Sequence, residues 1–283
     1  MPVTVAKTAG FCFGVRRAVD TVYRQLEESC RTESPKLYTL GEIIHNPQVV
    51  AELAARGIRA VDGPENVERG SVIIRSHGVT PAVRRAVEER ELPLIDATCP
   101  HVARAQKAAA ELARRCGCVV VVGEEGHPEV EGLVAYAREA GGEVFVVAAP
   151  GDLPASIEAP VGIVVQTTQT REALDAVVEA LAARGIRPEV KNTICFATRQ
   201  RQESAAALAD EVDAIVVIGG RNSSNTTRLA DICAAACPRT HHVEAPEELD
   251  PSWFVGCESV GVTAGASTPE DQIAAIVERL EAL

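Results

Sequence analysis

The sequence of 283 residues is 46% hydrophobic and carries a net charge of −12 at pH 7. It is long enough to bury a large core, and it is too acidic to offer the basic stripe of a nucleic-acid-binding surface. No apolar run is long enough to span a membrane, and the first residues lack the pattern of a secretory signal, so we expect a cytoplasmic protein with no nucleic-acid or membrane partner.

Nine cysteines are present, an odd number for a protein expected in a reducing compartment. A disulfide framework is therefore not expected, and metal ligation or catalysis is the better interpretation. The sequence contains no CxxC pair, which argues against a zinc ribbon or a thioredoxin-like motif. Four of the cysteines, Cys116, Cys118, Cys233 and Cys237, are expected in or near the core.

One local pattern recurs along the chain: a short Val/Ile-rich run, a polar loop, and then a helical pattern. The first instance places Cys12 in the loop of "VTVAKTAGFCFGVRRAV", and Arg16 and Arg17 of the following helix are expected on its solvated face. Two later loops of the same kind, "IIHNPQ" and "IIRSHGV", present His45 and His77. Such loops follow the carboxyl ends of strands, where open α/β sheets bind ligands.

The middle third repeats this pattern. Cys99 lies in "LIDATCPHV", between a strand and an Arg-bearing helix. The next loop, "GEEGHPEVEG", presents His127 and Glu129, and the loop "VVQTTQT" presents Thr167 and Thr168. The threonines could also be simple helix caps.

The last third again begins with a cysteine, Cys195, in "KNTICFATRQ". The motif "GGRNSSNTT" then presents Ser223, Ser224 and Asn225 at the start of a helix, where capping and ligand binding are compatible. The loop "TAGASTPE" presents Ser267 near the C-terminus.

The three cysteines recur at intervals close to the size of a small domain, and the polar loops follow each of them at similar offsets. We therefore predict an α/β protein of three related domains around a pseudo-threefold axis, each delivering one thiol and two polar loops to a common centre. The predicted domains are residues 1–97, 98–193 and 194–283, with the C-terminal segment packing back near the first domain.

Such a centre could hold zinc, although zinc sites usually draw cysteines from close pairs in sequence. A [4Fe–4S] cluster with three protein ligands would leave one iron open to bind a substrate oxygen, while the cluster supplies electrons. Phe11 and Phe13, on either side of Cys12, are then expected to keep water away from the cluster. Helix N-termini, with nearby serine, asparagine and protonated histidine side chains, would bind phosphate, and Glu129 could donate a proton.

Two other classes of protein use the same residues. A zinc-dependent or thiol-nucleophile hydrolase would use His127 and Glu129 as an acid–base pair and one cysteine as the nucleophile. A non-catalytic phosphometabolite-binding or iron–sulfur sensor protein would hold its ligand on "NSSN" without needing Glu129. Both leave several of the polar loops without a role.

Eight motifs together resemble, in order and from residue 12 to residue 270, the 4-hydroxy-3-methylbut-2-enyl diphosphate reductase (IspH/LytB) family. They are "AGFCFGVRRAV", "IHNPQVV", "RSHGV", "DATCP", "GHPEVEG", "TICFATRQRQ", "GGRNSSNTTRL" and "VTAGASTPE". The resemblance implies a trefoil of three α/β domains around one [4Fe–4S] cluster. It also implies reductive removal of an allylic hydroxyl to give isopentenyl and dimethylallyl diphosphate, the last step of the methylerythritol phosphate route to isoprenoids.

The resemblance also implies roles for individual residues. Cys12, Cys99 and Cys195 match the cluster ligands, and Glu129 matches the proton-relay acid. His127 matches a residue that contacts the substrate. The diphosphate pocket is matched by His45, His77, Ser223, Ser224, Asn225 and Ser267.

The threonine near the substrate hydroxyl is matched by Thr168, with Thr167 as the alternative register. The sequence shows no GxGxxG nicotinamide fingerprint and no evident flavin site. Electrons are therefore expected from an external carrier, and the family implies a ferredoxin or a flavodoxin. The substrate partner is the small allylic diphosphate.

Overall fold

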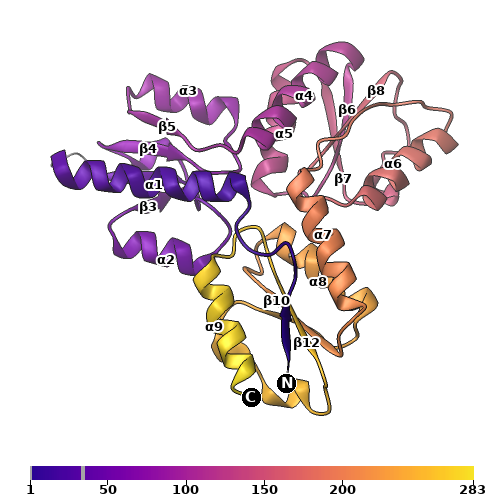
Figure 1. The fold of residues 1–283 in the computed structure, drawn as a ribbon. Coiled ribbons are helices and arrows are strands. Elements are labelled where there is room, and N and C mark those ends of the chain that lie inside the picture. Colours follow the sequence, from indigo (N-terminus) through magenta and orange to yellow (C-terminus); the bar gives the residue numbers. More distant parts are fainter. Residues whose placement is uncertain (1, 33–35) are drawn as a thin grey trace. The chain divides into compact units, whose positions relative to one another are not determined.

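The computed structural model describes residues 2–32 and 36–283, and their strands form three sheets of four parallel strands each (Figure 1). One sheet contains β2 (Leu37–Leu40), β3 (Arg59–Val61), β4 (Ser71–Ile74) and β5 (Leu94–Asp96). The next contains β6 (Cys118–Val122), β7 (Glu143–Val147), β8 (Val161–Val165) and β9 (Glu189–Lys191). The last contains β10 (Ala214–Ile218), β11 (Thr240–Val243), β12 (Val260–Ala264) and β1 (Val3–Val5). The predicted α/β class is confirmed.

Helices connect the strands within and between the sheets. They are α1 (Phe13–Thr32), α2 (Pro47–Ala55), α3 (Pro81–Glu89), α4 (Pro100–Cys116), α5 (Pro128–Glu139), α6 (Arg171–Ala183), α7 (Phe196–Ala209), α8 (Ser224–Ala236) and α9 (Glu270–Glu281). Short 3₁₀ turns are η1 (Pro64–Asn66), η2 (Pro150–Asp152), η3 (Pro246–Glu248) and η4 (Pro251–Phe254). Among the described residues, no helix combines the length and the apolarity needed to cross a membrane.

The three sheets share one strand order. The orders are β3-β2-β4-β5, β7-β6-β8-β9 and, read from the other edge, β11-β10-β12-β1. In each sheet the chain passes from the first central strand to a neighbouring edge strand. It then crosses back and forms the second central strand on the opposite side of the first. The central pairs β2 and β4, β6 and β8, and β10 and β12 are therefore topological switch points, where α/β sheets bind ligands.

Strand β1 does not belong to the sheet that the expected domain boundaries assign to it. Residues 1–97 are predicted as one domain, but β1 pairs in parallel with β12, with Val3 opposite Val260 and Val5 opposite Val262. The N-terminal strand thus fills the edge position of the C-terminal sheet, the position that β5 and β9 hold in the other two. A three-residue strand carries too little local pattern to specify its partner.

The strands at the switch points form the core. Strands β6, β8, β10 and β12 are buried at every residue, as expected for parallel strands covered on both faces. Alternate residues of β6 face opposite sides: Val119 and Val121 pack beneath α4 and α5, whereas Val120 and Val122 face the side of α6. Burial of both faces fixes each strand's register, and so fixes where each loop begins.

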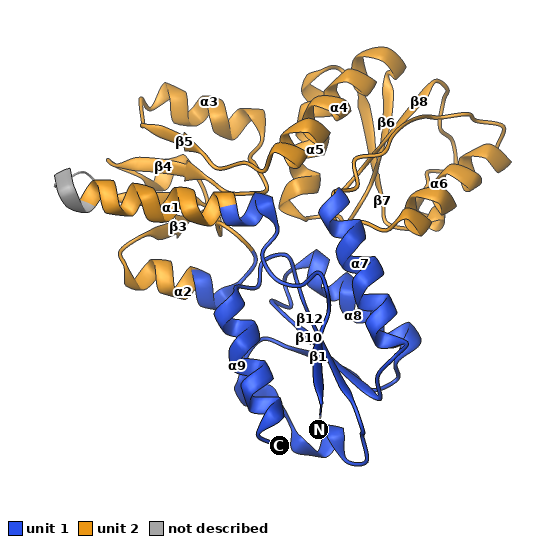
Figure 2. Ribbon diagram, in the orientation of Figure 1, with its two compact units in different colours: residues 1–16, 45–49, 196–283 blue, residues 17–44, 50–195 orange. Residues whose placement is uncertain are grey.

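The chain divides into two compact units (Figure 2). Unit 1 comprises residues 1–16, 45–49 and 196–283, and it contains the sheet of β1, β10, β11 and β12. Unit 2 comprises residues 17–44 and 50–195, and it contains the other two sheets. Within unit 2, the helices α3 and α5 contact each other, and Arg85 forms an ion pair with Glu139 at 2.5 Å.

Candidate functional site

The predicted polar site residues all follow the switch-point strands. His45 follows β2 and His77 follows β4. After β6 come His127, at the end of the loop, and Glu129, in the first turn of α5, and the loop after β8 carries Thr167 and Thr168. After β10 come Ser223, at the end of the loop, and Ser224 and Asn225, in the first turn of α8, and the loop after β12 carries Ser267. The sheet topology therefore selects the same loops that the sequence motifs single out.

The three predicted ligand cysteines follow β1, β5 and β9, which hold the same edge position in the three sheets, and their backbone amides make equivalent hydrogen bonds. Within unit 2, the Cys99 amide donates to the Ser76 carbonyl at 2.9 Å, and the Cys195 amide donates to the Thr167 carbonyl at 3.0 Å. Within unit 1, the Cys12 amide donates to the Ala266 carbonyl at 3.1 Å. Each acceptor lies two residues beyond the end of a second central strand, β4, β8 or β12. Each cysteine loop is thus anchored to the switch-point loop of its own sheet.

Each of these cysteines also lies at the start of a helix. The Cys12 carbonyl accepts from the Arg16 amide at 2.9 Å, and its Sγ accepts from the Val15 amide at 3.4 Å. Cys99 is the N-cap of α4, and Cys195 immediately precedes α7. The first turns of α1, α4 and α7 contain no acidic residue. Each cysteine therefore lies at the amide end of a helix whose first turn carries no negatively charged side chain.

The donor set fits an iron–sulfur cluster. All three cysteines are half-buried, so each thiol is reachable and partly shielded. Soft thiolates drawn from loops far apart in sequence are typical ligands of such clusters, whereas structural zinc sites use close cysteine pairs. The meeting of the three thiols at one centre stays a prediction.

Glu129 lies in the first turn of α5 and is almost completely buried, with 2% of its surface exposed. Its carboxylate accepts two hydrogen bonds from Thr167, from the amide at 2.6 Å and from the hydroxyl at 2.8 Å. Burial raises the pKa of Glu129 to about 7, and the two hydrogen bonds from Thr167 oppose that rise. A carboxyl group that titrates near neutral pH can both hold and release a proton during turnover.

His127 caps the helix that carries Glu129. Its Nδ1 accepts from the Glu129 amide at 3.1 Å, so the imidazole carries its proton at Nε2 and offers that N–H as its donor. Protonation of Nδ1 would remove this cap. The ring of His77 meets that of His127 edge to face, with centroids 5.6 Å apart. Unit 2 therefore brings His77, His127, Glu129 and Thr167 together.

The two threonines of "QTTQ" have different roles. Thr167 is buried and holds Glu129, whereas Thr168 is half-exposed and its hydroxyl accepts from the Gln166 amide nitrogen Nε2 at 3.1 Å. Thr168 is thus the threonine with a partly accessible side chain, and its placement at the substrate hydroxyl stays a prediction. The role of Thr167 as the partner of Glu129 was not predicted from the sequence.

In unit 1, buried polar side chains gather at the start of α8, and we call Ser223, Ser224 and Asn225 the polar cradle. Ser223 caps the helix by accepting from the Thr226 amide at 3.4 Å. Asn225 has only 5% of its surface exposed, and neither its Oδ1 nor its Nδ2 has a hydrogen-bond partner. A buried amide without partners is costly, so these two atoms indicate a polar ligand at this helix start.

Glycines keep this cradle open. A Cβ added to Gly265 would lie 2.0 Å from Thr226 Oγ1, and one added to Gly219 would lie 2.8 Å from the same oxygen. Thr226 Oγ1 is itself buried without a partner. Close approach of the loops after β10 and β12 therefore depends on residues that have no side chain.

Ser267 and the His45 segment are tied together within unit 1. Ser267 Oγ donates to the His45 carbonyl at 2.9 Å, and Asn46 Nδ2 donates to the Ser267 carbonyl at 2.9 Å. Asn46 is fully buried, and its Oδ1 accepts from the Val49 amide in the first turn of α2. The sequence indicated His45 and Ser267 but not Asn46, which joins their loops.

Several other expectations can be compared with the structure. Cys118, Cys233 and Cys237 are buried and Cys116 is half-buried, so the predicted core positions are confirmed. Phe13 is 68% exposed, and the expectation that it keeps water away from a bound cluster stays a prediction.

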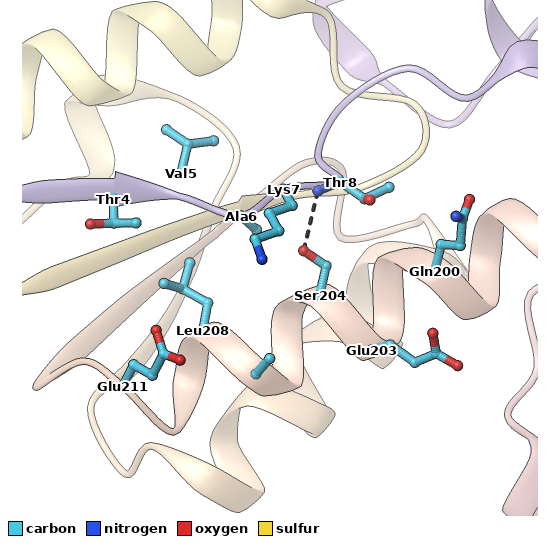
Figure 3. Close-up of a pocket in the computed structure, with 11 residues that line it drawn as sticks. Thr4, Val5, Ala6, Lys7, Thr8, Gln200, Glu203, Ser204, Leu208 and Glu211 are labelled. Carbon is cyan, nitrogen blue, oxygen red and sulfur yellow. Dashed lines mark hydrogen bonds between the residues drawn. The ribbon is translucent and has the colours of Figure 1, made fainter.

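A cavity of about 390 Å³ lies between the β1 segment and α7, and it contains none of the predicted site residues (Figure 3). Its lining includes the Lys7 and Glu203 side chains, and the Thr8 amide donates to Ser204 Oγ at 3.2 Å across one side. It lies beside the segment that leads from β1 to Cys12.

Comparisons with known proteins identify the family of the chain. The family model described as LytB protein matches residues 3–281. The 4-hydroxy-3-methylbut-2-enyl diphosphate reductase of Geobacter sulfurreducens is 47% identical over 283 residues, which cover 99% of this chain and 97% of the relative. The protein of the same name from Citrifermentans bemidjiense is 48% identical over 287 residues, which cover 100% of this chain and 98% of the relative.

Solved structures are similar over the same length. The structure of (E)-4-hydroxy-3-methyl-but-2-enyl diphosphate reductase, the terminal enzyme of the non-mevalonate pathway, covers 100% of both chains with a TM-score of 0.71 and 44% identity. The structure of the E-1-hydroxy-2-methyl-but-2-enyl-4-diphosphate reductase from Plasmodium falciparum gives a TM-score of 0.87 at 25% identity, covering 98% of this chain and 86% of that one. The chain belongs to the LytB family, as its motifs predict.

Proposed function

We propose that this protein is a 4-hydroxy-3-methylbut-2-enyl diphosphate reductase. It removes the allylic hydroxyl group of its substrate by a two-electron reduction and forms isopentenyl and dimethylallyl diphosphate, in the last step of the methylerythritol phosphate pathway. Family membership supports this assignment. The observation that carries it is the buried carboxyl of Glu129, whose pKa of about 7 suits a proton donor at neutral pH.

The proposed cofactor is one [4Fe–4S] cluster held by Cys12, Cys99 and Cys195. When bound, the cluster supplies electrons and an open iron that acts as a Lewis acid toward the substrate oxygen. The chain contributes the three sulfur ligands, each at the start of a helix that has no acidic residue in its first turn.

The diphosphate group is bound at the start of α8. Asn225 donates through its unpaired Nδ2, and backbone amides at the helix start add further donors toward the phosphate oxygens. Ser223, Ser224, Ser267, His45 and His77 complete the proposed pocket. Because the protein as a whole carries −12, this anion depends on local donors and not on the overall field.

Proton supply is assigned to Glu129. The reaction consumes two electrons and two protons: one proton leaves with the hydroxyl group as water, and the other completes the new C–H bond. Glu129 donates the first, since its protonated form persists at neutral pH. His127 offers its Nε2–H to the substrate, and Thr168 lies at the substrate hydroxyl. Thr167 keeps the Glu129 carboxyl in position from two donors.

The electrons come from an external one-electron carrier of the ferredoxin or flavodoxin type, and the reaction takes place in the cytoplasm. The chain has no nucleotide fingerprint that would allow it to take electrons from a nicotinamide directly.

The decisive experiment is anaerobic purification followed by iron and sulfide analysis and a turnover assay with the allylic diphosphate. The wild type should be brown, contain about four irons per chain and reduce the substrate. Cys99→Ser should lose iron and activity together, whereas Glu129→Gln should keep the cluster spectrum and lose nearly all turnover. Cys116→Ser, at a half-buried cysteine outside the proposed set, is the matched control and should match the wild type. A colourless zinc protein, or an active Glu129→Gln variant, contradicts the assignment.

A further inference from the structure

The loop that leads to Cys12 is fastened to α7 by a buried arginine. Arg201 has 2% of its surface exposed. Its Nη2 donates to the Gly10 carbonyl at 2.7 Å, and its Nη1 donates to the Ala197 carbonyl at 3.1 Å. Gly10 is two residues before Cys12, and Ala197 is two residues after Cys195. One guanidinium therefore joins the approach to one predicted ligand with the helix that follows another.

Two further features restrict this loop. The Thr8 amide donates to Ser204 Oγ at 3.2 Å, about one turn farther along α7 (Figure 3). Gly10 has a φ of +78°, and a Cβ there would lie 2.9 Å from Ile273 Cδ1 and 3.1 Å from the Thr268 carbonyl oxygen. The backbone at Gly10 is thus held in a left-handed turn with little space around it, with its carbonyl toward Arg201.

A second arginine makes the corresponding contact in unit 2. Arg17 of α1, the helix that follows Cys12, donates from Nη1 to the Thr98 carbonyl at 2.9 Å and from Nη2 to the Asp96 carbonyl at 3.5 Å. Thr98 immediately precedes Cys99. The Thr98 amide in turn donates to Asp96 Oδ1 at 2.9 Å, so the loop before Cys99 is bound from two sides. The sequence predicts Arg17 on a solvated face, and this expectation is wrong, because the side chain is half-buried against this loop.

Packing alone does not account for Arg201. Burying a guanidinium costs several kcal/mol, and an apolar side chain of similar volume would fill the same space without that cost. What arginine adds is a planar fork of donors and a permanent positive charge. Both properties suit a residue beside an iron–sulfur cluster whose ligands come from separate loops. Hydrogen bonds to these loops hold the ligands in position, and the positive charge favours the reduced form of the cluster.

We propose that Arg201 and Arg17 are positioning residues for the cluster ligands. Each lies on the helix that follows one ligand cysteine and holds the loop that presents a different one: Arg201 links the helix after Cys195 to the Cys12 loop, and Arg17 links the helix after Cys12 to the Cys99 loop. This inference rests on the proposed function, since it assumes that the three cysteines share one cluster.

The test compares Arg201→Met, Arg201→Lys and Arg17→Met with the wild type, all reconstituted anaerobically. Arg90→Met is the matched control, because Arg90 also donates to a backbone carbonyl, that of Val67 at 3.0 Å, away from the cysteine loops. Three quantities are measured on each holoprotein: iron and sulfide per chain, the rate of iron loss to a chelator, and the midpoint potential from a titration followed by electron paramagnetic resonance.

Both Met variants should lose iron about 10-fold faster or more, as removal of outer-shell partners of metal ligands typically does. Arg201→Met should have a more negative midpoint potential because a buried positive charge is gone. Arg201→Lys keeps the charge without the fork, so it should lose iron faster than the wild type while its potential stays nearer to the wild-type value. Arg90→Met should match the wild type in all three.

Wild-type rates of iron loss in Arg201→Lys and Arg17→Met would overturn the proposal, and these two variants decide it if Arg201→Met fails to fold by circular dichroism. A wild-type protein that takes up no cluster would instead contradict the proposed function. The two failures are therefore distinguishable.

Discussion

The hydrogen bond between the Thr167 hydroxyl and Glu129 gives a quantitative prediction for the pH dependence of turnover. Thr167→Val keeps the shape of the side chain and the backbone donor at 2.6 Å, and it removes only the hydroxyl donor at 2.8 Å. That hydroxyl stabilises the ionised carboxylate and so lowers the pKa of Glu129, against the larger effect of burial. Its removal should raise this pKa above its present value of about 7.

The size of the effect follows from the strength of the bond. A hydrogen bond to a charged group contributes about 1.5–3 kcal/mol, and 1.36 kcal/mol corresponds to one pH unit. Because the protonated form of Glu129 is the proton donor, turnover falls as pH rises through its pKa. In Thr167→Val this falling limb should therefore move to higher pH by about one to two units.

The assay is kcat measured from acidic to alkaline pH with a chemically reduced viologen as the electron donor, so that a protein carrier does not limit the rate. Thr168→Val is the matched control: its hydroxyl accepts from Gln166, and the hydrogen bonds that lower the pKa of Glu129 come from Thr167, so this variant should lower turnover without moving the limb. A limb that stays at its wild-type position in Thr167→Val, or moves to lower pH, would refute the reasoning.

Three further predictions concern the same residues. The pKa of Glu129 is about 7 in the folded chain and its ordinary 4.5 in the unfolded chain, so the free energy of unfolding should fall by about 3 kcal/mol as pH rises from the lower value to the higher. In Glu129→Gln, chemical denaturation at acidic and alkaline pH should show no such loss. A loss equal to that of the wild type would contradict the burial argument. Asn225→Leu should weaken the binding of inorganic pyrophosphate about 10-fold or more in calorimetry while leaving the ligand-free protein at least as stable, because the amide is buried without partners; a large drop in stability would show that the amide is already satisfied. Gly265→Ala should destabilise the protein by about 1–3 kcal/mol, and adding Thr226→Ala should restore part of that loss in a double-mutant cycle, whereas strict additivity would contradict the predicted clash.

Much of the fold is predictable because parallel α/β units repeat a local pattern. The buried Val/Ile runs of β6, β8, β10 and β12 are evident in the sequence, and each is followed by a loop and a helix start. Since parallel strands present their carboxyl ends at one edge, the polar loops after these strands are the natural candidates for a ligand site. The cysteine motifs add three further loops with the same construction.

Other features depend on contacts between distant segments, and local patterns do not specify them. Strand β1 is too short to indicate its partner, and only its pairing with β12 places the N-terminus in the last sheet. Thr167 and Thr168 are equivalent in sequence, and the approach of Glu129, 38 residues away, decides which one binds the carboxylate. Arg17 belongs to a polar helix face that becomes half-buried because the loop before Cys99 packs on it.

The sequence by itself determined the α/β class, the three repeated units, the family, and the residue types available for chemistry. These follow from short-range periodicity and from motifs that each lie within one loop. Only the tertiary structure decided the environment of those residues: the burial that raises the pKa of Glu129 to about 7, the unpaired amide of Asn225, and the arginine contacts that hold the cysteine loops. The physical reason is that burial, pairing and electrostatic environment are properties of neighbours in space, and most of these neighbours are far apart in the chain.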